Sequence, residues 1–237
     1  NNGGCMSFEN NTQLNIYSSK LHNNIAGTSG GIVYMKSKSN LYTISHTDIR
    51  NNTAVNGDGG GFCNAPIYNI FQTVVHDNTA KYDGGFVNID SMYENRLRIH
   101  RSSFENNRAL EGSGGSIEIN DVLSDGLFID LESSRFIHNE AGKHGGFMYI
   151  KDNNIRLNLT NSTMILNKAM NGDGGCISSL SNVYMNMTNI NMISNEAGNN
   201  GGCMSFENNT QLNIYSSKLH NNIAGTSGGI VYMKSKS

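Results

Sequence analysis

The sequence predicts an all-β protein: a right-handed parallel β-helix with three short strands per turn and about 28 residues per turn. Two repeated patterns carry this prediction. Gly-Gly pairs recur along the whole chain at intervals of 24 to 31 residues, and each interval holds one pattern of apolar, two variable residues, Asn, one variable residue and Ala. Repeats of this length are typical of a stacked unit that cannot bury its apolar face alone. In addition, no segment shows sustained helical periodicity.

The Gly-Gly pairs place the first expected strand of each unit. The pairs begin at Gly3, Gly30, Gly60, Gly84, Gly114, Gly145, Gly174, Gly201 and Gly228. Two and four residues past a pair the side chains are mostly apolar, as at Ile117 and Ile119, and this alternation is expected of a strand with one buried face. In the third unit the same count selects Cys63 and Ala65.

Two further strands follow in each unit. A second alternating pair precedes the Asn pattern, as at Leu97 and Ile99, and the apolar residue of the pattern itself anchors a third strand, as at Phe104. Successive units are expected to pair as parallel, in-register strands about 4.7–4.9 Å apart. A β-sandwich would not keep this register, and left-handed β-helices usually carry six-residue repeats that are absent here.

A longer period lies above the short one. Residues 1–39 are identical to residues 199–237, at an offset of 198. Chance cannot produce this identity, so it indicates either tandem repetition of a 198-residue unit or a recent duplication. We therefore expect 1–237 to form one continuous β-helix of about eight turns, with 1–198 as one long repeat and 199–237 as the start of the next.

The Asn of the repeated pattern is expected to stack in one column at a corner of the helix. The column consists of Asn24, Asn52, Asn78, Asn107, Asn139, Asn167, Asn195 and Asn222. A carboxamide has both donors and an acceptor, so each can bond to its copy one turn away. We favour this structural ladder over a ligand-binding column, because a ladder satisfied internally has little left to offer a ligand.

No pattern predicts a catalytic, cofactor or metal site. Asp58, Asp83 and Asp173 precede Gly-Gly pairs but are isolated, whereas calcium needs several converging oxygens. The histidines lack metal-ligand spacing, and a row of Ser and Thr before the Asn pattern is explained by turn capping. Polysaccharide-cleaving β-helices gather Asp with Arg or Lys in one groove, which this sequence does not show. We therefore expect no enzymatic activity.

The residue directly after each Gly-Gly pair leaves two interpretations open. Strict alternation would turn it outward and create an exposed apolar stripe for lateral association. That stripe would contain Ile32, Phe62, Phe86 and Phe147, with Tyr34 and Tyr149 on the same side. The alternative places these side chains at a corner facing the core.

The composition and the sequons indicate which partners and which cellular compartment are compatible with this sequence. A net charge of −2 with 15% charged residues disfavours nucleic acid or a membrane surface as partner, and no apolar run is long enough to span a membrane. Cysteine is odd in number within one long period, which argues against a fully paired disulfide framework. N-glycosylation sequons begin at Asn10, Asn51, Asn158, Asn161, Asn186 and Asn208. They are either sites or products of a chain with 38 Asn, and crowding should keep Asn158 and Asn186 from both carrying glycans.

Both repeated patterns together resemble the repeats of chlamydial polymorphic membrane proteins, which combine GGA[ILV] with FxxN. FENN at 104–107 and FIHN at 136–139 match FxxN, while GGIV at 30–33 and GGSI at 114–117 approach the glycine motif. The resemblance implies an extracellular or cell-surface β-helical protein, often an adhesin.

These observations give three functional hypotheses. The first is a non-enzymatic extracellular fibre of tandem 198-residue repeats, whose partner is the protein itself, along the axis or side by side. The alternative is a surface adhesin or binding stalk that recognises a partner or glycans. A polysaccharide lyase or hydrolase is the remote alternative.

Overall fold

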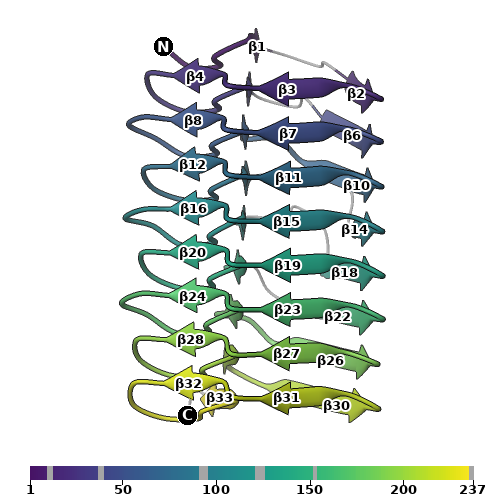
Figure 1. Ribbon diagram of the computed structural model, residues 1–237, viewed down its shortest axis with the longest axis vertical. Helices are drawn as coiled ribbons and strands as arrows, with labels where there is room; N and C mark the ends of the chain where they lie inside the picture. The colour runs from purple at the N-terminus through teal and green to yellow at the C-terminus, as the bar shows by residue number, and fades with distance from the viewer. Residues whose placement is uncertain (10–12, 37–39, 91–95, 121–125, 152–153, 235–237) are drawn as a thin grey trace.

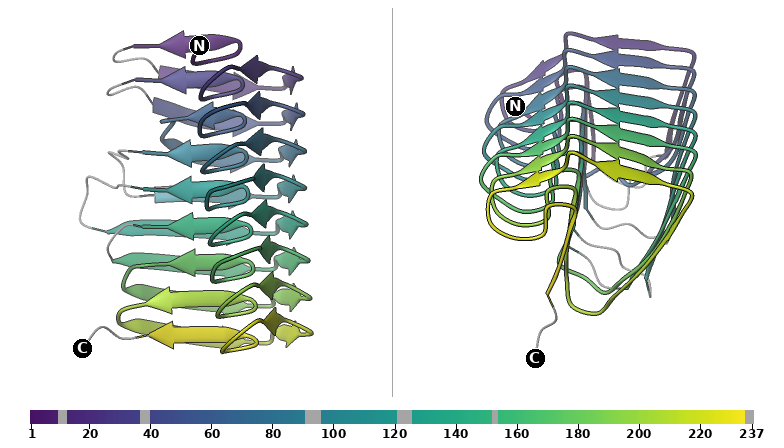
Figure 2. Two further views of the ribbon diagram at one scale, coloured as in Figure 1. Left: turned by 90° about the vertical axis from the view of Figure 1, so that its left-hand side faces the viewer. Right: turned by 60° about the horizontal axis from the view of Figure 1, so that its bottom comes forward.

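The computed structural model describes residues 1–9, 13–36, 40–90, 96–120, 126–151 and 154–234. The chain winds into a parallel β-helix in which strands stack coil upon coil (Figure 1). With the C-terminal end toward the reader, the chain runs counter-clockwise as it approaches (Figure 2, right), so the winding is right-handed. Equivalent residues on neighbouring coils are 25 to 32 positions apart, and all recorded pairings are parallel. The fold class predicted from the sequence is confirmed.

The described strands form four sheets, each running the length of the helix. Sheet A contains β1 (Met6–Phe8), β5 (Val33–Met35), β9 (Phe62–Cys63), β13 (Val87–Ile89), β17 (Ile117–Ile119), β21 (Met148–Ile150), β25 (Ile177–Ser179), β29 (Met204–Glu207) and β33 (Val231–Lys234). Sheet B contains β2 (Gln13–Tyr17), β6 (Asn40–Ser45), β10 (Ile67–Phe71), β14 (Arg96–His100), β18 (Leu127–Glu132), β22 (Ile155–Thr160), β26 (Val183–Thr188) and β30 (Thr210–Tyr215).

The other two sheets carry the repeated Asn pattern. Sheet C contains β3 (Lys20–His22), β7 (Asp48–Arg50), β11 (Val74–His76), β15 (Ser103–Glu105), β19 (Arg135–Ile137), β23 (Thr163–Ile165), β27 (Asn191–Ile193) and β31 (Lys218–His220). Sheet D contains β4 (Ile25–Ala26), β8 (Thr53–Ala54), β12 (Thr79–Ala80), β16 (Arg108–Ala109), β20 (Glu140–Ala141), β24 (Lys168–Ala169), β28 (Glu196–Ala197) and β32 (Ile223–Ala224).

Sheet D corrects the expectation of three strands per coil, because the Ala of the Asn pattern belongs to a fourth, two-residue strand. The Gly-Gly pair packs its backbone against this sheet. A Cβ on Gly31 would lie 1.9 Å from the Gly60 carbonyl oxygen and 2.7 Å from the Thr53 nitrogen. Gly30 has φ +68°, a left-handed conformation that glycine adopts at least cost. The first glycine therefore makes the turn, and the second allows close backbone contact.

The third coil has a different register from the one the sequence count gave. Gly59, at φ +64°, is the equivalent of Gly30, so the pair begins one residue earlier than Gly60. Phe62 consequently pairs with Val33 and Val87, whereas Cys63 lies in the neighbouring outward row. Because three consecutive glycines allow two possible pairs, the predicted pair Gly60–Gly61 was wrong and the structural pair is Gly59–Gly60.

The residues expected either as an exposed stripe or as core are buried. Ile32, Phe86 and Phe147 have no exposed surface, and Phe147 contacts Phe136 with ring centroids 4.1 Å apart. Phe62 is also fully buried but belongs to sheet A, since Gly61 occupies the position after the glycine pair.

The two tyrosines of the same set lie on the outer side of sheet A. Tyr149 is only 5% exposed because the His144 ring stacks against it at 5.4 Å, and Tyr34 is half-buried. The six residues therefore do not form an exposed apolar stripe, because the bend after the glycines directs that position into the core.

The interior is one continuous apolar cluster enclosed by sheets A, B and C. The alternating pairs predicted for the second strand, such as Leu97 and Ile99, are fully buried. In the described part of the chain no helix is long and apolar enough to cross a membrane.

Candidate functional site

The predicted Asn column is a closed hydrogen-bond ladder. Asn107 donates its Nδ2 proton to Asn139 Oδ1 at 3.0 Å and to the Val75 carbonyl at 3.1 Å. Its own Oδ1 accepts from the backbone nitrogen and Nδ2 of Asn78 at 3.2 and 2.9 Å. The same pattern recurs along the column, and the six inner members have no exposed surface. The ladder prediction is confirmed, and every inner carboxamide is used within the fold.

The Ser and Thr row caps turns, as expected. Ser134 Oγ donates to the Glu132 carbonyl at 2.7 Å and accepts the Ser102 backbone N–H at 3.1 Å. The aspartates before the glycine pairs have a related role, since Asp83 Oδ1 accepts the Ser113 backbone N–H at 2.7 Å. Among the described residues no group of three or more metal-ligating side chains could hold an ion.

The sequons fall into different environments. Asn51 and Asn161 are exposed at left-handed corners, while Asn208 is half-buried and its Nδ2 donates to the Leu180 carbonyl. Asn158 and Asn186 are vertical neighbours on sheet B, as the sequence spacing predicted. Asn10 lies outside the described residues.

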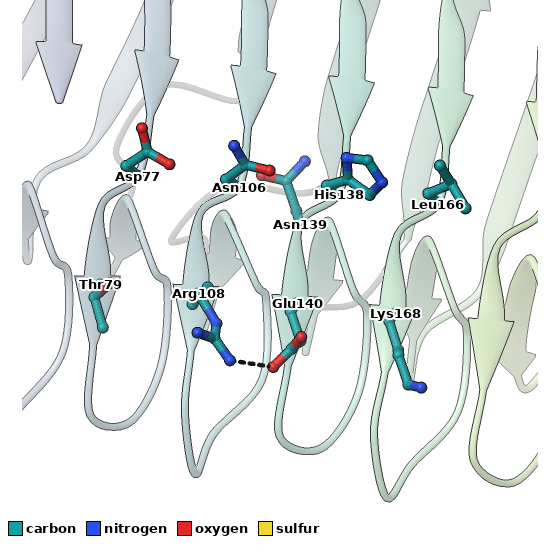
Figure 3. Close-up of a pocket in the computed structure, with 9 residues that line it drawn as sticks. All are labelled: Asp77, Thr79, Asn106, Arg108, His138, Asn139, Glu140, Leu166 and Lys168. Atoms are coloured by element: carbon teal, nitrogen blue, oxygen red, sulfur yellow. Dashed lines mark hydrogen bonds and ion pairs between the residues drawn. The ribbon is translucent and has the colours of Figure 1, made fainter. Parts of the chain in front are cut away.

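A hollow of about 520 Å³ lies at the corner between sheets C and D (Figure 3). Its lining consists of Asp77, Thr79, Asn106, Arg108, His138, Asn139, Glu140, Leu166 and Lys168. Two of the charged groups here pair along the axis, since Arg108 contacts Glu140 at 2.8 Å and Lys168 contacts Glu196, outside the lining, at 2.9 Å; Asp77 contacts His76 Nδ1 at 2.6 Å. Both Arg108 and Lys168 are paired, whereas no ion pair among the described residues engages Arg98 or Arg156 on sheet B, so this groove is the weaker candidate.

The outer side of sheet A carries a buried polar row instead of a ligand site. Glu118 has no exposed side-chain surface and contacts Lys151 Nζ at 2.6 Å and Asn88 Nδ2 at 2.7 Å. Burial and the charge of Asp83 raise the pKa of Glu118 to about 7, against the opposing influence of Lys151 and Asn88. Burial likewise raises the pKa of Cys63 to about 12. The row is inaccessible, so it serves the fold.

The outer face of sheet B holds a second carboxamide ladder that the sequence reading did not identify. Asn158 Nδ2 donates to Asp130 Oδ1 at 3.0 Å, Asn186 to Asn158 at 3.2 Å, and Asn213 to Asn186 at 2.9 Å. Asp130 ends this outer ladder and also accepts from Arg96 Nε and Nη2 at 2.9 and 2.7 Å. Unlike the inner ladder, these side chains are only half-buried, so they form a flat polar floor open to solvent.

Beside this floor, guanidinium and aromatic groups alternate on successive coils. The register places Arg96 beside Phe128, Phe128 beside Arg156, and Arg156 beside Tyr184. We call these four residues the Arg–aromatic row. Arg156 lies over the Phe128 ring at 5.3 Å, and Tyr184 is 40% exposed. The sequence contained this signal, because each member directly precedes an inward residue: Leu97, Ile129, Leu157 and Met185.

Two hollows open on this same face. One of about 280 Å³ spans β14, β18 and β22, and its lining includes Arg96, Arg98, His100 and Glu132. The other, of about 480 Å³, spans β22, β26 and β30 and includes Arg156, Tyr184 and Gln211. Side chains with exposed cations, planar rings and amide groups therefore converge along one stretch of sheet B. This stretch is the best candidate functional site in the described chain.

The fold and this exposed face define a class of protein, a parallel β-helix with a polar, ring-bearing outer sheet. No protein-family model matches the chain, and no solved structure matches it. The chain is similar to the probable autotransporter YfaL of Escherichia coli K12, with 28% identity over 174 residues. The alignment covers 65% of this chain and 13% of that protein, so the chain spans a small part of its relative.

Proposed function

We propose that this chain is a segment of a surface-displayed β-helical passenger, a stiff and non-enzymatic stalk held outside the cell. The similarity to an autotransporter supports a surface location, as does the resemblance of the repeats to those of polymorphic membrane proteins. The observation that carries the stalk role is the inner Asn ladder, which continues through all its coils without a break.

Stiffness follows from the way neighbouring coils are joined. Each pair of coils shares strand pairing in four sheets together with the Asn ladder, and the Ser/Thr row adds hydrogen bonds between several of them. Bending the helix would stretch these hydrogen bonds on one side in many coils at once. The identity between 1–39 and 199–237 supports repetition of the same unit along the axis, which would lengthen such a stalk.

The non-enzymatic part of the proposal is supported by how the polar rows are used. The inner Asn, the Ser/Thr row and the turn aspartates all hydrogen-bond within the fold, and Glu118 is buried beside Lys151. The adhesin alternative is favoured by one specific observation, the Arg–aromatic row with its two adjoining hollows. We treat binding as a property that the stalk adds on its outer face.

Surface display tests the proposal. The chain is fused to a secretion signal and to the membrane-anchoring part of an autotransporter, expressed in E. coli, and exposed to protease on intact cells. The stalk predicts surface exposure, resistance of the folded helix to protease, and straight rods in negative-stain images. A matched fusion with Asn107→Leu should lose protease resistance. Rapid degradation of the unaltered protein, or release of reducing sugars from a polysaccharide panel, would overturn the proposal.

A further inference from the structure

We propose that the outer face of sheet B between β14 and β30 binds a linear acidic polysaccharide that runs along the helix axis. The ligand would carry a carboxylate or sulfate on alternate sugars. This inference rests on the proposed surface function, since it names the ligand class for the same exposed face.

The spacing of the cations sets the ligand's repeat. Arg96 and Arg156 occupy the same row two coils apart, with Phe128 between them. Coils stack at about 4.8 Å, so the two guanidinium groups project from positions about 10 Å apart. Each sugar of a linear polysaccharide advances the chain by about one coil spacing. Acidic groups on every second sugar therefore match guanidinium groups on every second coil, and Arg96, whose Nε and Nη2 donate to Asp130, offers its remaining N–H groups.

The aromatic rings of the Arg–aromatic row can pack against the sugar rings of the ligand. Phe128 is half-buried and held by Arg156 at 5.3 Å, and the next ring, Tyr184, is 40% exposed. An aromatic face packs against the apolar C–H face of a pyranose, and a guanidinium binds a carboxylate or sulfate through two parallel hydrogen bonds. The row thus offers both interactions in alternation, which neither a uniform cationic patch nor an aromatic patch would provide.

A third cation lies in the smaller hollow. Arg98 is exposed in the middle row of β14, beside Asn69 on one side and Asp130 on the other. Within the described residues none of the ion pairs involves Arg98, because Asp130 is held by Arg96 and Glu132 lies 3.6 Å from His100. Its guanidinium is therefore available to an incoming anion.

The floor of the face can bind neutral hydroxyl groups. In the outer ladder Asn158 and Asn186 each use one Nδ2 proton toward the preceding coil, whereas Asn213 Nδ2 contacts both Asn186 Oδ1 and Tyr184 Oη. A primary amide has a second N–H, and the half-buried position leaves it toward solvent. Sugar hydroxyls can accept from these amides along the same axial line.

The carboxylate of Asp130 repels an anionic ligand, so a substitution of Asp130 tests the proposal. Its carboxylate neutralises Arg96 at 2.7 Å and lies beside Arg98 in the register. Asp130→Asn keeps the shape of the side chain and extends the existing run of carboxamides, so the fold should tolerate it. Removing this negative charge should strengthen binding of an anionic ligand, which no purely structural role would produce.

The experiment measures binding of purified protein to size-defined oligosaccharides by calorimetry. The probes are hyaluronan and chondroitin sulfate (acid on alternate sugars as carboxylate alone or with sulfate), polygalacturonate (acid on every sugar), neutral dextran, dextran sulfate and duplex DNA. The alternating-acid probes should bind most tightly. Arg98→Gln and Arg156→Gln should each weaken that binding about tenfold, the loss of one charge-assisted contact. Tyr184→Ala should also weaken it, and Asp130→Asn should tighten it severalfold.

Arg135→Gln is the matched control. The side chain of Arg135 is 65% exposed on sheet C and lies 3.8 Å from Glu105. The substitution therefore removes the same charge as the sheet B variants, but from another face. Its affinity should equal that of the unaltered protein.

Three outcomes would overturn the inference. These are equal binding to neutral dextran, equal binding to all polyanions including DNA, and no effect of the sheet B variants relative to Arg135→Gln. Circular dichroism and melting of each variant separate lost binding from lost fold. Failure here with intact surface rods would leave the proposed stalk standing, whereas degraded or absent rods would remove the stalk itself.

Discussion

Two regions of this molecule share one sequence and have different environments. The segment 1–39 contains β1 to β5, and the identical segment 199–237 contains β29 to β33, at the two ends of the helix (Figure 1). Cys5 is exposed, yet its copy Cys203 is fully buried; Phe8 is half-buried, yet Phe206 has no exposed surface. The first member of each pair has a neighbouring coil on one side, while the second lies between two coils.

The contrast reverses further along the same segments. Ile16 is 7% exposed and its copy Ile214 is 42% exposed; Met35 is 1% exposed and Met233 is 46% exposed. Met35 in β5 lies between two coils and Met233 in β33 lies in the last strand, whereas Ile16 in β2 and Ile214 in β30 lie at opposite ends of sheet B, with a coil on one side only. The same letters are therefore core or surface according to the coils above and below them, as expected when stability is a sum of nearest-neighbour contacts.

The largest expected contrast is in thiol reactivity. Cys5 should react with iodoacetamide as a free exposed thiol, whereas Cys203 should react on the order of 1000-fold more slowly, since it requires local unfolding. Burial also raises the pKa of the Cys203 thiol, which disfavours the reactive thiolate. Trypsin places the two identical sites in different peptides, 1–20 and 169–218, and fragment ions distinguish Cys203 from Cys176 in the second peptide, so mass spectrometry can follow each site. Equal rates would contradict the burial difference.

A second test compares the two phenylalanines. Phe206→Ala should lower the free energy of unfolding by about 3–5 kcal/mol, the range for a fully buried aromatic side chain. Phe8→Ala should cost clearly less, because Phe8 already contacts solvent. Urea denaturation of both variants measures the difference. Equal losses would mean that the first coil is as well packed as the interior.

The Asn ladder extends the contrast to hydrogen bonding. Asn107→Leu should destabilise by about 1–3 kcal/mol for each buried partner left unpaired. Asn24→Leu, at the partly exposed first coil, should cost less because water can replace the lost bonds. Thermal melting of the two variants gives the comparison, and unchanged melting of Asn107→Leu would refute a stabilising ladder.

The smallest effect concerns pH. The outward row of sheet A runs from Ser7 in β1 through Ser205 in β29 to Tyr232 in β33, and it holds the buried Glu118 in its middle. Its pKa is raised from 4.5 to about 7, so the folded state binds the proton more tightly than the unfolded chain. The stabilising contribution of this proton is complete below pH 4.5 and is lost as pH rises through about 7.

Between pH 4.5 and 7.5 the free energy of unfolding should fall by roughly 1–2 kcal/mol less in Glu118→Gln than in the unaltered protein. Glu196→Gln, an exposed control, should keep the profile of the unaltered protein. Denaturation midpoints at pH 4.5, 6 and 7.5 give the comparison. The same slope in Glu118→Gln and in the unaltered protein would contradict the assignment.

Features that depend on equivalent residues stacking on successive coils could be predicted from the sequence. A fixed repeat determines which residues stack, so the parallel helix, the inner rows and the column from Asn24 to Asn222 were all accessible from spacing alone. The fourth strand was missed because a two-residue strand has no alternation to detect. The register at Gly59–Gly61 was missed because three identical residues allow two alignments.

Contacts between different sheets or turns of the same coil were harder to predict from the sequence. Burial of Tyr149 depends on the ring of His144, a contact between a turn and a sheet that no period reports. The Arg–aromatic row lies one residue before each inward position, but an outward row has no apolar periodicity that distinguishes it from other exposed positions. Whether a row lies open, as on sheet B, or covered, as on sheet A, required the three-dimensional structure.

The two carboxamide ladders have one consequence for the electrical character of the rod. In the inner ladder the side-chain oxygens point toward the N-terminal end, since Asn139 Oδ1 accepts from Asn107. In the outer ladder they point toward the C-terminal end, since Asn158 Oδ1 accepts from Asn186. The bond dipoles of the two columns therefore oppose each other, as those of peptide groups in a sheet largely do. The inner column contains eight carboxamides and the outer ladder three, so the outer ladder offsets only part of the dipole of the inner column.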